Sequence, residues 1–120
     1  MRLSIRNRFT GTVYPRSGQV EAVVDTGYDG FLLVPEALYA EAGFGEGVSA
    51  TRDVYVADGR KVTMRSTVAA VEVHGIQRLY DGFIETGPGI GEVLAGARLL
   101  NRFRVTLDYC SGTAQLAPCG

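Results

Sequence analysis

The stretch VEAVVDTGYDGFLLVP, residues 20–35, decides the fold of this 120-residue chain. Residues 20–24 are mostly apolar and β-branched, a composition that favours a strand. This strand ends at Asp25, and Gly27 and Gly30 indicate that a turn precedes the second apolar run, FLLV. An acidic side chain is therefore expected between two short strands, at the first position of a glycine-containing turn.

Asp25 allows two interpretations on local pattern alone. A carboxylate among apolar neighbours is costly to bury unless it is hydrogen-bonded or paired, which favours a functional role. Alternatively, Asp25 only organises the turn together with the amides of Thr26 and Gly27. The triplet Asp-Thr-Gly is short enough to occur by chance, so the choice depends on the surrounding sequence.

The rest of the chain is typical of short strands separated by turns. Pro35 followed by good helix formers predicts a helix over residues 36–42, with Gly43 as its C-terminal cap. Asp58-Gly59 predicts the turn of a hairpin. Further strands are expected at residues 54–57, 62–64, 67–73, 76–85, 93–95, 104–109 and 113–116, loops at 45–52 and 86–91, and a helix at 97–103.

Two segments of the chain share a pattern. Residues 23–27 (VVDTG) and residues 93–96 (VLAG) each place an apolar strand directly before a glycine-containing turn. This weak twofold repeat predicts that two strand–turn units meet at the centre of a mostly antiparallel β fold.

In this context the segment around Asp25 resembles the retropepsin-like aspartic proteases, and more specifically their small standalone prokaryotic members. The matching features are Asp25-Thr26-Gly27-Tyr28 followed by an apolar run and a helix, the second unit at residues 93–109, and a hairpin at Asp58-Gly59 where the family carries its flap. They span about residues 18–109. The resemblance implies a mainly β, closed β-barrel-type acid protease fold with one or two short helices. It also implies one domain over residues 1–120, with a flap hairpin at about 53–66 and a C-terminal strand and tail at 104–120.

The activity implied by the resemblance is that of an aspartic endopeptidase, which hydrolyses peptide bonds by water attack. Such enzymes use two carboxylates that share one proton, because two like charges so close together cannot both ionise. This chain holds one Asp-Thr-Gly, and Leu94-Ala95-Gly96 stands where a second aspartate would be needed. One chain therefore encodes half of the site, and the dyad requires a homodimer in which Asp25 meets its symmetry copy.

The catalytic residues that the resemblance implies are Asp25, Thr26 and Gly27. Thr26 is expected to hydrogen-bond across the twofold axis, and Gly27 to let the substrate backbone approach closely. The positions expected to contact a peptide or protein substrate are Tyr28, Asp29, Ala57, Asp58, Gly59 and Gly96.

Asp29 and the hairpin each keep a second interpretation. In the family an acid at this position contacts substrate backbone or pairs with an arginine of the second unit. Arg98 is the candidate here, although Ala97 stands where the family often has that arginine. Asp29 could equally be a solvated acid beside Gly30. The hairpin turn is of a standard type, so the hairpin could be structural rather than a flap.

Composition and charge argue against several other classes of protein. Hydrophobic residues make up 46% and charged residues 21%, with a formal net charge of -1, which is typical of an ordinary globular domain. No apolar run reaches the roughly 18–20 residues of a membrane helix. The first ten residues lack the apolar centre of a secretory signal, so a cytoplasmic location without a membrane partner is expected. The N-terminal arginines are not interleaved with stacking aromatics, so no nucleic-acid partner is expected.

Neither a metal nor a cofactor is expected. Cys110, Cys119 and His74 cannot supply the four ligands of a closed structural zinc site. The two cysteines are expected as free thiols in the cytoplasm, with a bridge between them as the alternative. The glycine-rich segment at residues 86–91 (TGPGIG) matches neither of the common phosphate-loop patterns.

Two other functions compete with a protease. The first is a non-catalytic peptide-binding or dimerisation module that retains the aspartic protease fold. The second is a phosphoryl-transfer enzyme, since an Asp-x-Gly turn also occurs in actin-like kinases, but those folds need a much longer chain and two phosphate loops.

Overall fold

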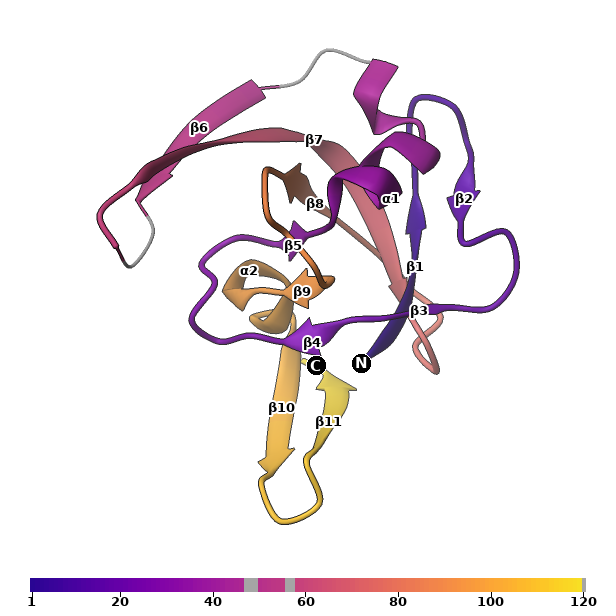
Figure 1. Ribbon diagram of the computed structural model, residues 1–120. Coiled ribbons are helices and arrows are strands. Elements are labelled where there is room, and N and C mark those ends of the chain that lie inside the picture. Colours follow the sequence, from indigo (N-terminus) through magenta and orange to yellow (C-terminus); the bar gives the residue numbers. More distant parts are fainter. Residues whose placement is uncertain (47–49, 56–57, 120) are drawn as a thin grey trace.

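Most of the strands form one strongly curled β-sheet (Figure 1). The computed structural model describes residues 1–46, 50–55 and 58–119. Its sheet strands are β1 (Arg2–Arg6), β2 (Val13–Tyr14), β3 (Val20–Glu21), β4 (Val23–Val24), β5 (Leu32–Leu33), β6 (Ala50–Tyr55), β7 (Lys61–Val73), β8 (Leu79–Thr86) and β9 (Leu94–Ala95). Over the described residues their order is β2–β1–β7–β8–β5–β9–β4, with β3 paired to β1 and β6 paired to β7.

The core lies inside the curl of the sheet. Alternate residues of β7 are buried at Thr67, Ala69, Val71 and Val73, as expected for a strand with one face toward the core. Leu3 and Ile5 of β1, Val34, Ile84 and Leu99 are fully buried in the same cluster. The long, curved strand β7 pairs with β1 on one side and with β8 on the other. It therefore connects β1 to the central strands of the sheet (Figure 1).

Short helices follow two of the central strands. Helix α1 (Glu36–Glu41) begins after Pro35, which has extended backbone, and the chain leaves it through Gly43 at φ 83°. Only glycine adopts this left-handed conformation without strain, so the predicted cap is confirmed. A 3₁₀ turn, η1 (Phe44–Glu46), follows, and α2 (Ala97–Leu100) comes directly after β9. The mainly β class with short helices is confirmed.

A second sheet of two strands projects from the body of the molecule (Figure 1). Strand β10 (Phe103–Asp108) pairs antiparallel with β11 (Thr113–Pro118), in register from Phe103 opposite Pro118 to Asp108 opposite Thr113. Val105 and Leu116 pack against the main core. The tail predicted at residues 104–120 is thus a β-hairpin over the residues described, which exclude Gly120.

Several predicted element boundaries are wrong. Residues 50–52, expected in a loop, begin strand β6, because their backbone pairs with β7 although their polar side chains are exposed. The strands expected at 62–64 and 67–73 are one strand, since β7 pairs with β6 up to Ser66 and with β8 from Arg65 onward. The strand expected at 20–24 is interrupted at Ala22, and the helix expected at 97–103 ends at Leu100.

The meeting of the two strand–turn units is confirmed. Strands β4 and β9 pair in parallel, with Val23 opposite Leu94 and Val24 opposite Ala95. Strand β9 also pairs antiparallel with β5, so it lies between the two strands that flank the Asp25 turn. This pairing fixes where the turn leaves the sheet.

Candidate active site

Asp25 occupies the first position after β4, at the start of the turn. Its backbone N–H donates to the carbonyl oxygen of Ala95 at 3.0 Å, which extends the β4–β9 pairing by one residue. Its side chain is half-buried, and Oδ1 accepts the backbone N–H of Gly27 at 2.9 Å. The turn-organising contact considered from the sequence is therefore present. This contact engages one of the two carboxylate oxygens, Oδ1.

The second unit holds the turn through its backbone. The N–H groups of Ala97 and Arg98, at the start of α2, donate to the carbonyl oxygens of Tyr28 (2.8 Å) and Gly30 (3.0 Å). These amides have no partner within the helix, so the turn satisfies them. Gly96 is buried against the same turn, where a β-carbon would stand 2.8 Å from the Tyr28 carbonyl oxygen. The turn and α2 thus form one closely packed unit.

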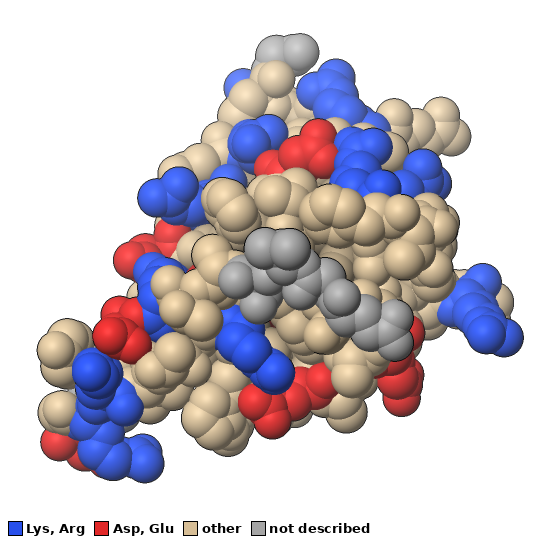
Figure 2. Space-filling model, turned by 90° about the horizontal axis from the view of Figure 1, so that it is seen from above, with Lys and Arg blue, Asp and Glu red and all other residues tan. Residues whose placement is uncertain are grey.

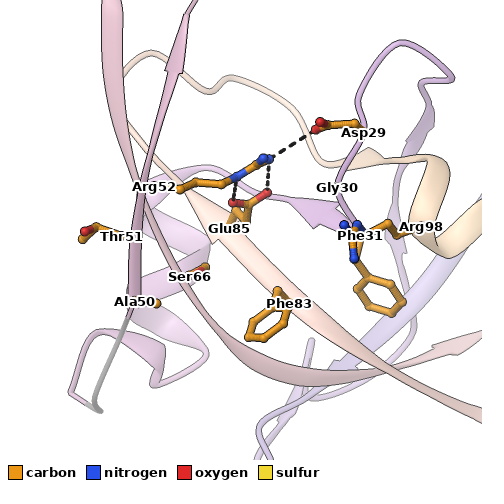
Figure 3. Close-up of a pocket in the computed structure, with 10 residues that line it drawn as sticks. All are labelled: Asp29, Gly30, Phe31, Ala50, Thr51, Arg52, Ser66, Phe83, Glu85 and Arg98. Atoms are coloured by element: carbon orange, nitrogen blue, oxygen red, sulfur yellow. Dashed lines mark hydrogen bonds and ion pairs between the residues drawn. The ribbon is translucent and has the colours of Figure 1, made fainter.

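The other predicted residues of the turn differ in exposure. Thr26 and Gly27 are exposed beside Asp25, whereas Tyr28 is half-buried. The structure therefore brings Asp25, Thr26, Gly27, Tyr28 and Gly96 together. Asp29 is exposed and points toward Arg52 on strand β6 of the hairpin (Figure 3).

A buried carboxylate organises the region beyond the turn (Figure 3). Glu85, at the end of β8, is 4% exposed. It accepts hydrogen bonds from Arg52 Nε at 2.6 Å and Arg52 Nη2 at 2.8 Å, and from the hydroxyl of Tyr28. Burial raises the pKa of the Tyr28 phenol, and the hydrogen bond to Glu85 and its charge raise it further. The pKa of Arg52 is also raised, chiefly by its hydrogen bond to Glu85.

Asp29 pairs with Arg52 rather than with Arg98. The Nη2 atom of Arg52 lies 3.3 Å from Asp29 Oδ1. The suggested pairing with Arg98 is wrong because the β6–β7 hairpin brings another arginine to this acid. Arg98 instead lines the cleft described next.

A cleft of about 300 Å³ lies between the turn and the hairpin. Figure 3 shows its lining residues, which come from the turn, β6, β7, β8 and α2. They are Asp29, Gly30, Phe31, Ala50, Thr51, Arg52, Ser66, Phe83, Glu85 and Arg98. Phe83 is 54% exposed, which gives the cleft an apolar wall that a ligand could cover. Asp25 is not among the lining residues; the cleft begins at Asp29.

Asp58 and Gly59, two of the predicted substrate contacts on the hairpin, are not among the residues that line this cleft. Ala57 falls outside the described residues. Asp58 accepts the backbone N–H of Arg60 at 2.9 Å and pairs with the Arg60 side chain, and Gly59 has φ +86°. The turn conformation explains the glycine. The hairpin residues that line the cleft are instead on its strands: Ala50, Thr51, Arg52 and Ser66.

Sequence reasoning missed Arg52 and Glu85. Residues 83–86 (FIET) place an acid at the end of an otherwise apolar strand, which was the available signal. A buried acid requires a partner, but the partner lies 33 positions away along the chain. Local pattern does not identify such a pair.

Among the described residues, no group of three His, Cys, Asp or Glu side chains could hold a metal ion. Cys110 and Cys119 are free and exposed, as expected. Figure 2 shows basic and acidic side chains interspersed over the face that it draws. No helix in the described part of the chain combines the length and apolar character needed to cross a membrane.

Comparison with solved structures defines the class of fold. The EIAV protease complexed with the inhibitor HBY-793 superposes with a TM-score of 0.60 at 17% identity, covering 84% of this chain and 83% of that chain. The retroviral protease-like domain of Ddi1 from Leishmania major superposes with a TM-score of 0.54 at 14% identity, covering 97% and 86%. The fold is therefore retropepsin-like, as the sequence predicted.

A relative in sequence shows the family of the chain. An "Uncharacterized protein" of Archaeoglobus fulgidus is 30% identical over 115 residues, which cover 96% of this chain and 90% of that protein. The chain belongs to the same family as this archaeal protein. No protein-family model matches the chain.

Proposed function

We propose that the protein is an aspartic endopeptidase of the small, standalone retropepsin-like type, with the DTG triplet as its catalytic motif. The observation that carries the proposal is the position of Asp25: a half-buried carboxylate at the exit of β4, on a turn held by β9 and α2. The matching strand β9 is followed by Gly96 and supplies no acid. Each chain therefore contributes one catalytic carboxylate.

In the proposed mechanism two copies of Asp25 face each other across a twofold axis and share one proton. The ionised carboxylate takes a proton from water as the water attacks the peptide carbonyl carbon, and the protonated one donates to the carbonyl oxygen. The pair titrates as a unit because each charge disfavours the other. Thr26 would connect the two turns, and Gly27 would admit the substrate backbone.

Exposed apolar side chains beside Asp25 support a homodimer. Val23 is 47% exposed two residues before the aspartate, and Leu107 and Tyr109 at the end of β10 are 40% and 89% exposed. A second cleft of about 420 Å³ lies between β4 and the β10–β11 hairpin. A second copy that covered these residues would remove their apolar surface from water.

The substrate is proposed to be a peptide in extended conformation along the turn and the cleft. An extended strand pairs its backbone groups with an exposed strand edge and places alternate side chains in pockets. Tyr28, Asp29 and Gly96 would contact it from the turn, and residues 57–59 from the hairpin. In this proposal residues 1–120 act as one protease domain, with a flap at about 53–66 and a C-terminal segment at 104–120. The exposed free thiols suit a cytoplasmic location.

The test of the activity is Asp25→Asn in a peptide-mixture assay followed by mass spectrometry. We expect the wild type to cleave peptides and the variant to cleave none, while both sediment as dimers with the same circular dichroism spectrum. Cleavage by the variant at the wild-type rate would defeat the mechanism. A wild type that is fully active as a strict monomer would defeat the shared dyad.

A non-catalytic peptide-binding module remains the second candidate. The Asp25–Gly27 contact favours it, because a turn-organising aspartate needs no catalytic role. This candidate predicts saturable peptide binding without turnover across acid to neutral pH. The protease predicts turnover in the same titration.

A further inference from the structure

Glu85 is the one charged side chain that is buried among the described residues, at 4% exposure. A buried carboxylate is stable only when its desolvation is compensated by close partners. Glu85 has three such hydrogen bonds, two from the Arg52 guanidinium and one from the Tyr28 hydroxyl. An apolar residue at this strand position would avoid the cost of desolvating a carboxylate. Stability alone therefore does not explain why Glu85 is present.

The three residues come from three separate segments that surround the cleft. Tyr28 lies in the turn that follows Asp25, Arg52 lies on β6, and Glu85 is the last but one residue of β8. Figure 3 shows Arg52 and Glu85 beside the cleft. The Nη2 atom that binds Glu85 also lies 3.3 Å from Asp29. One guanidinium thus connects the hairpin to the sheet and to the exposed acid of the turn.

Gly30 makes room for this arrangement. A β-carbon at this position would overlap the Tyr28 hydroxyl and stand 2.7 Å from Glu85 Oε1. The position has no positive φ that would by itself require glycine. The absence of a side chain at residue 30 is therefore explained by the contact between Tyr28 and Glu85.

We propose that Glu85, which also accepts the Tyr28 hydroxyl, fixes the Arg52 guanidinium in place. Arg52 then holds the Asp29 carboxylate and the base of the β6–β7 hairpin in a fixed geometry along the cleft. Glu85, Tyr28 and Arg52, here called the clamp, are positioning residues for the proposed peptidase reaction, and the inference rests on that function. The clamp determines how tightly the cleft binds a peptide, and the chemical step belongs to Asp25. Only a planar guanidinium fits the contact, because lysine offers a point charge without the paired N–H groups.

The kinetic test uses Glu85→Gln, Tyr28→Phe and Arg52→Lys with an internally quenched peptide chosen from the peptides that the wild type cleaves. Because the clamp acts on binding in the ground and transition states alike, KM should rise at least about tenfold while kcat stays within about twofold. A purely structural role would instead lower the fraction of active enzyme, and so kcat, at unchanged KM. Arg8→Lys is the matched control, since Arg8 pairs with Asp81 on the same strand at an exposed site.

A second measurement reports on the clamp without catalysis. In ¹⁵N NMR spectra of the wild type, the Arg52 Nε–H should exchange with water at least about tenfold more slowly than that of Arg60, whose pair with Asp58 is exposed. Glu85→Gln should remove this protection. The proposal would be overturned if the Arg52 Nε–H of the wild type exchanged as fast as that of Arg60. It would also be overturned if the three clamp variants had the KM of the wild type. If the wild type cleaves no peptide, the peptidase assignment fails and the exchange measurement alone decides for or against the clamp.

Discussion

A β-carbon on Gly96 would overlap the carbonyl oxygen of Gly30. The N-terminus of α2 and the turn after Asp25 are therefore in direct backbone contact. We expect Gly96→Ala to push the two segments apart and to lower the free energy of unfolding by about 1–3 kcal/mol, as overpacking in a closely packed site does. Urea unfolding followed by circular dichroism measures this change.

The matched control for that substitution is Gly91→Ala. Gly91 has open space where its β-carbon would be added and no positive φ, so its replacement should change the unfolding free energy by less than about 0.5 kcal/mol. Equal stability of both variants would show that the contact between Gly96 and Gly30 does not constrain the turn.

The raised pKa of Tyr28 predicts a loss of stability at alkaline pH. The phenol ionises in the unfolded chain near pH 10 but stays protonated in the folded chain to higher pH. Its stabilising contribution is fully present below pH 10 and is lost as the pH rises toward the folded pKa. Stability should fall by up to about 1.4 kcal/mol per pH unit above 10 through this residue. Urea unfolding at pH 9 and pH 11 measures the fall.

Two variants isolate the contribution of Tyr28 to this fall. Tyr28→Phe should show a smaller loss of stability between pH 9 and pH 11 than the wild type. Tyr109→Phe, at a residue 89% exposed, should show the same loss as the wild type. If all three proteins lose the same stability, the phenol of Tyr28 ionises as freely when folded as when unfolded, contrary to the expectation.

The apolar residues beside β4 predict the surface of the dimer. Leu107→Lys would place a charge in the proposed contact, so the dissociation constant measured by sedimentation should rise at least about tenfold. Phe9→Lys replaces an equally apolar residue, 73% exposed on the segment after β1, and should leave dimerisation unchanged. A dimer that dissociates with Phe9→Lys and not with Leu107→Lys would place the contact elsewhere.

The fold around Asp25 could be predicted from the sequence because its signals are local. A β-branched run, a glycine-containing turn and a proline before helix formers identify β4, the turn and α1. The repeat at residues 93–96 predicted that the two units meet, and the parallel pairing of β4 with β9 confirms it.

The outer wall of the cleft could not be predicted in this way. Residues 50–52 (ATR) carry no apolar alternation, because β6 lies at the edge of the sheet with exposed side chains, so they were expected in a loop. The partner of Asp29 depends on which arginine side chain the curled hairpin places within reach of this acid. That choice follows from the tertiary path of β6 and β7 rather than from spacing, and it favours Arg52 over Arg98.

The shared dyad is tested most directly by mixing subunits. The wild type at fixed concentration is equilibrated with increasing Asp25→Asn variant, and peptide cleavage is measured. If an active site needs one Asp25 from each subunit, mixed dimers are inactive, and a ninefold excess of variant should reduce activity to about one tenth. A variant that also carries Leu107→Lys should inhibit far less. Activity that stays constant as the inactive subunit is added would contradict a site built from two copies of Asp25.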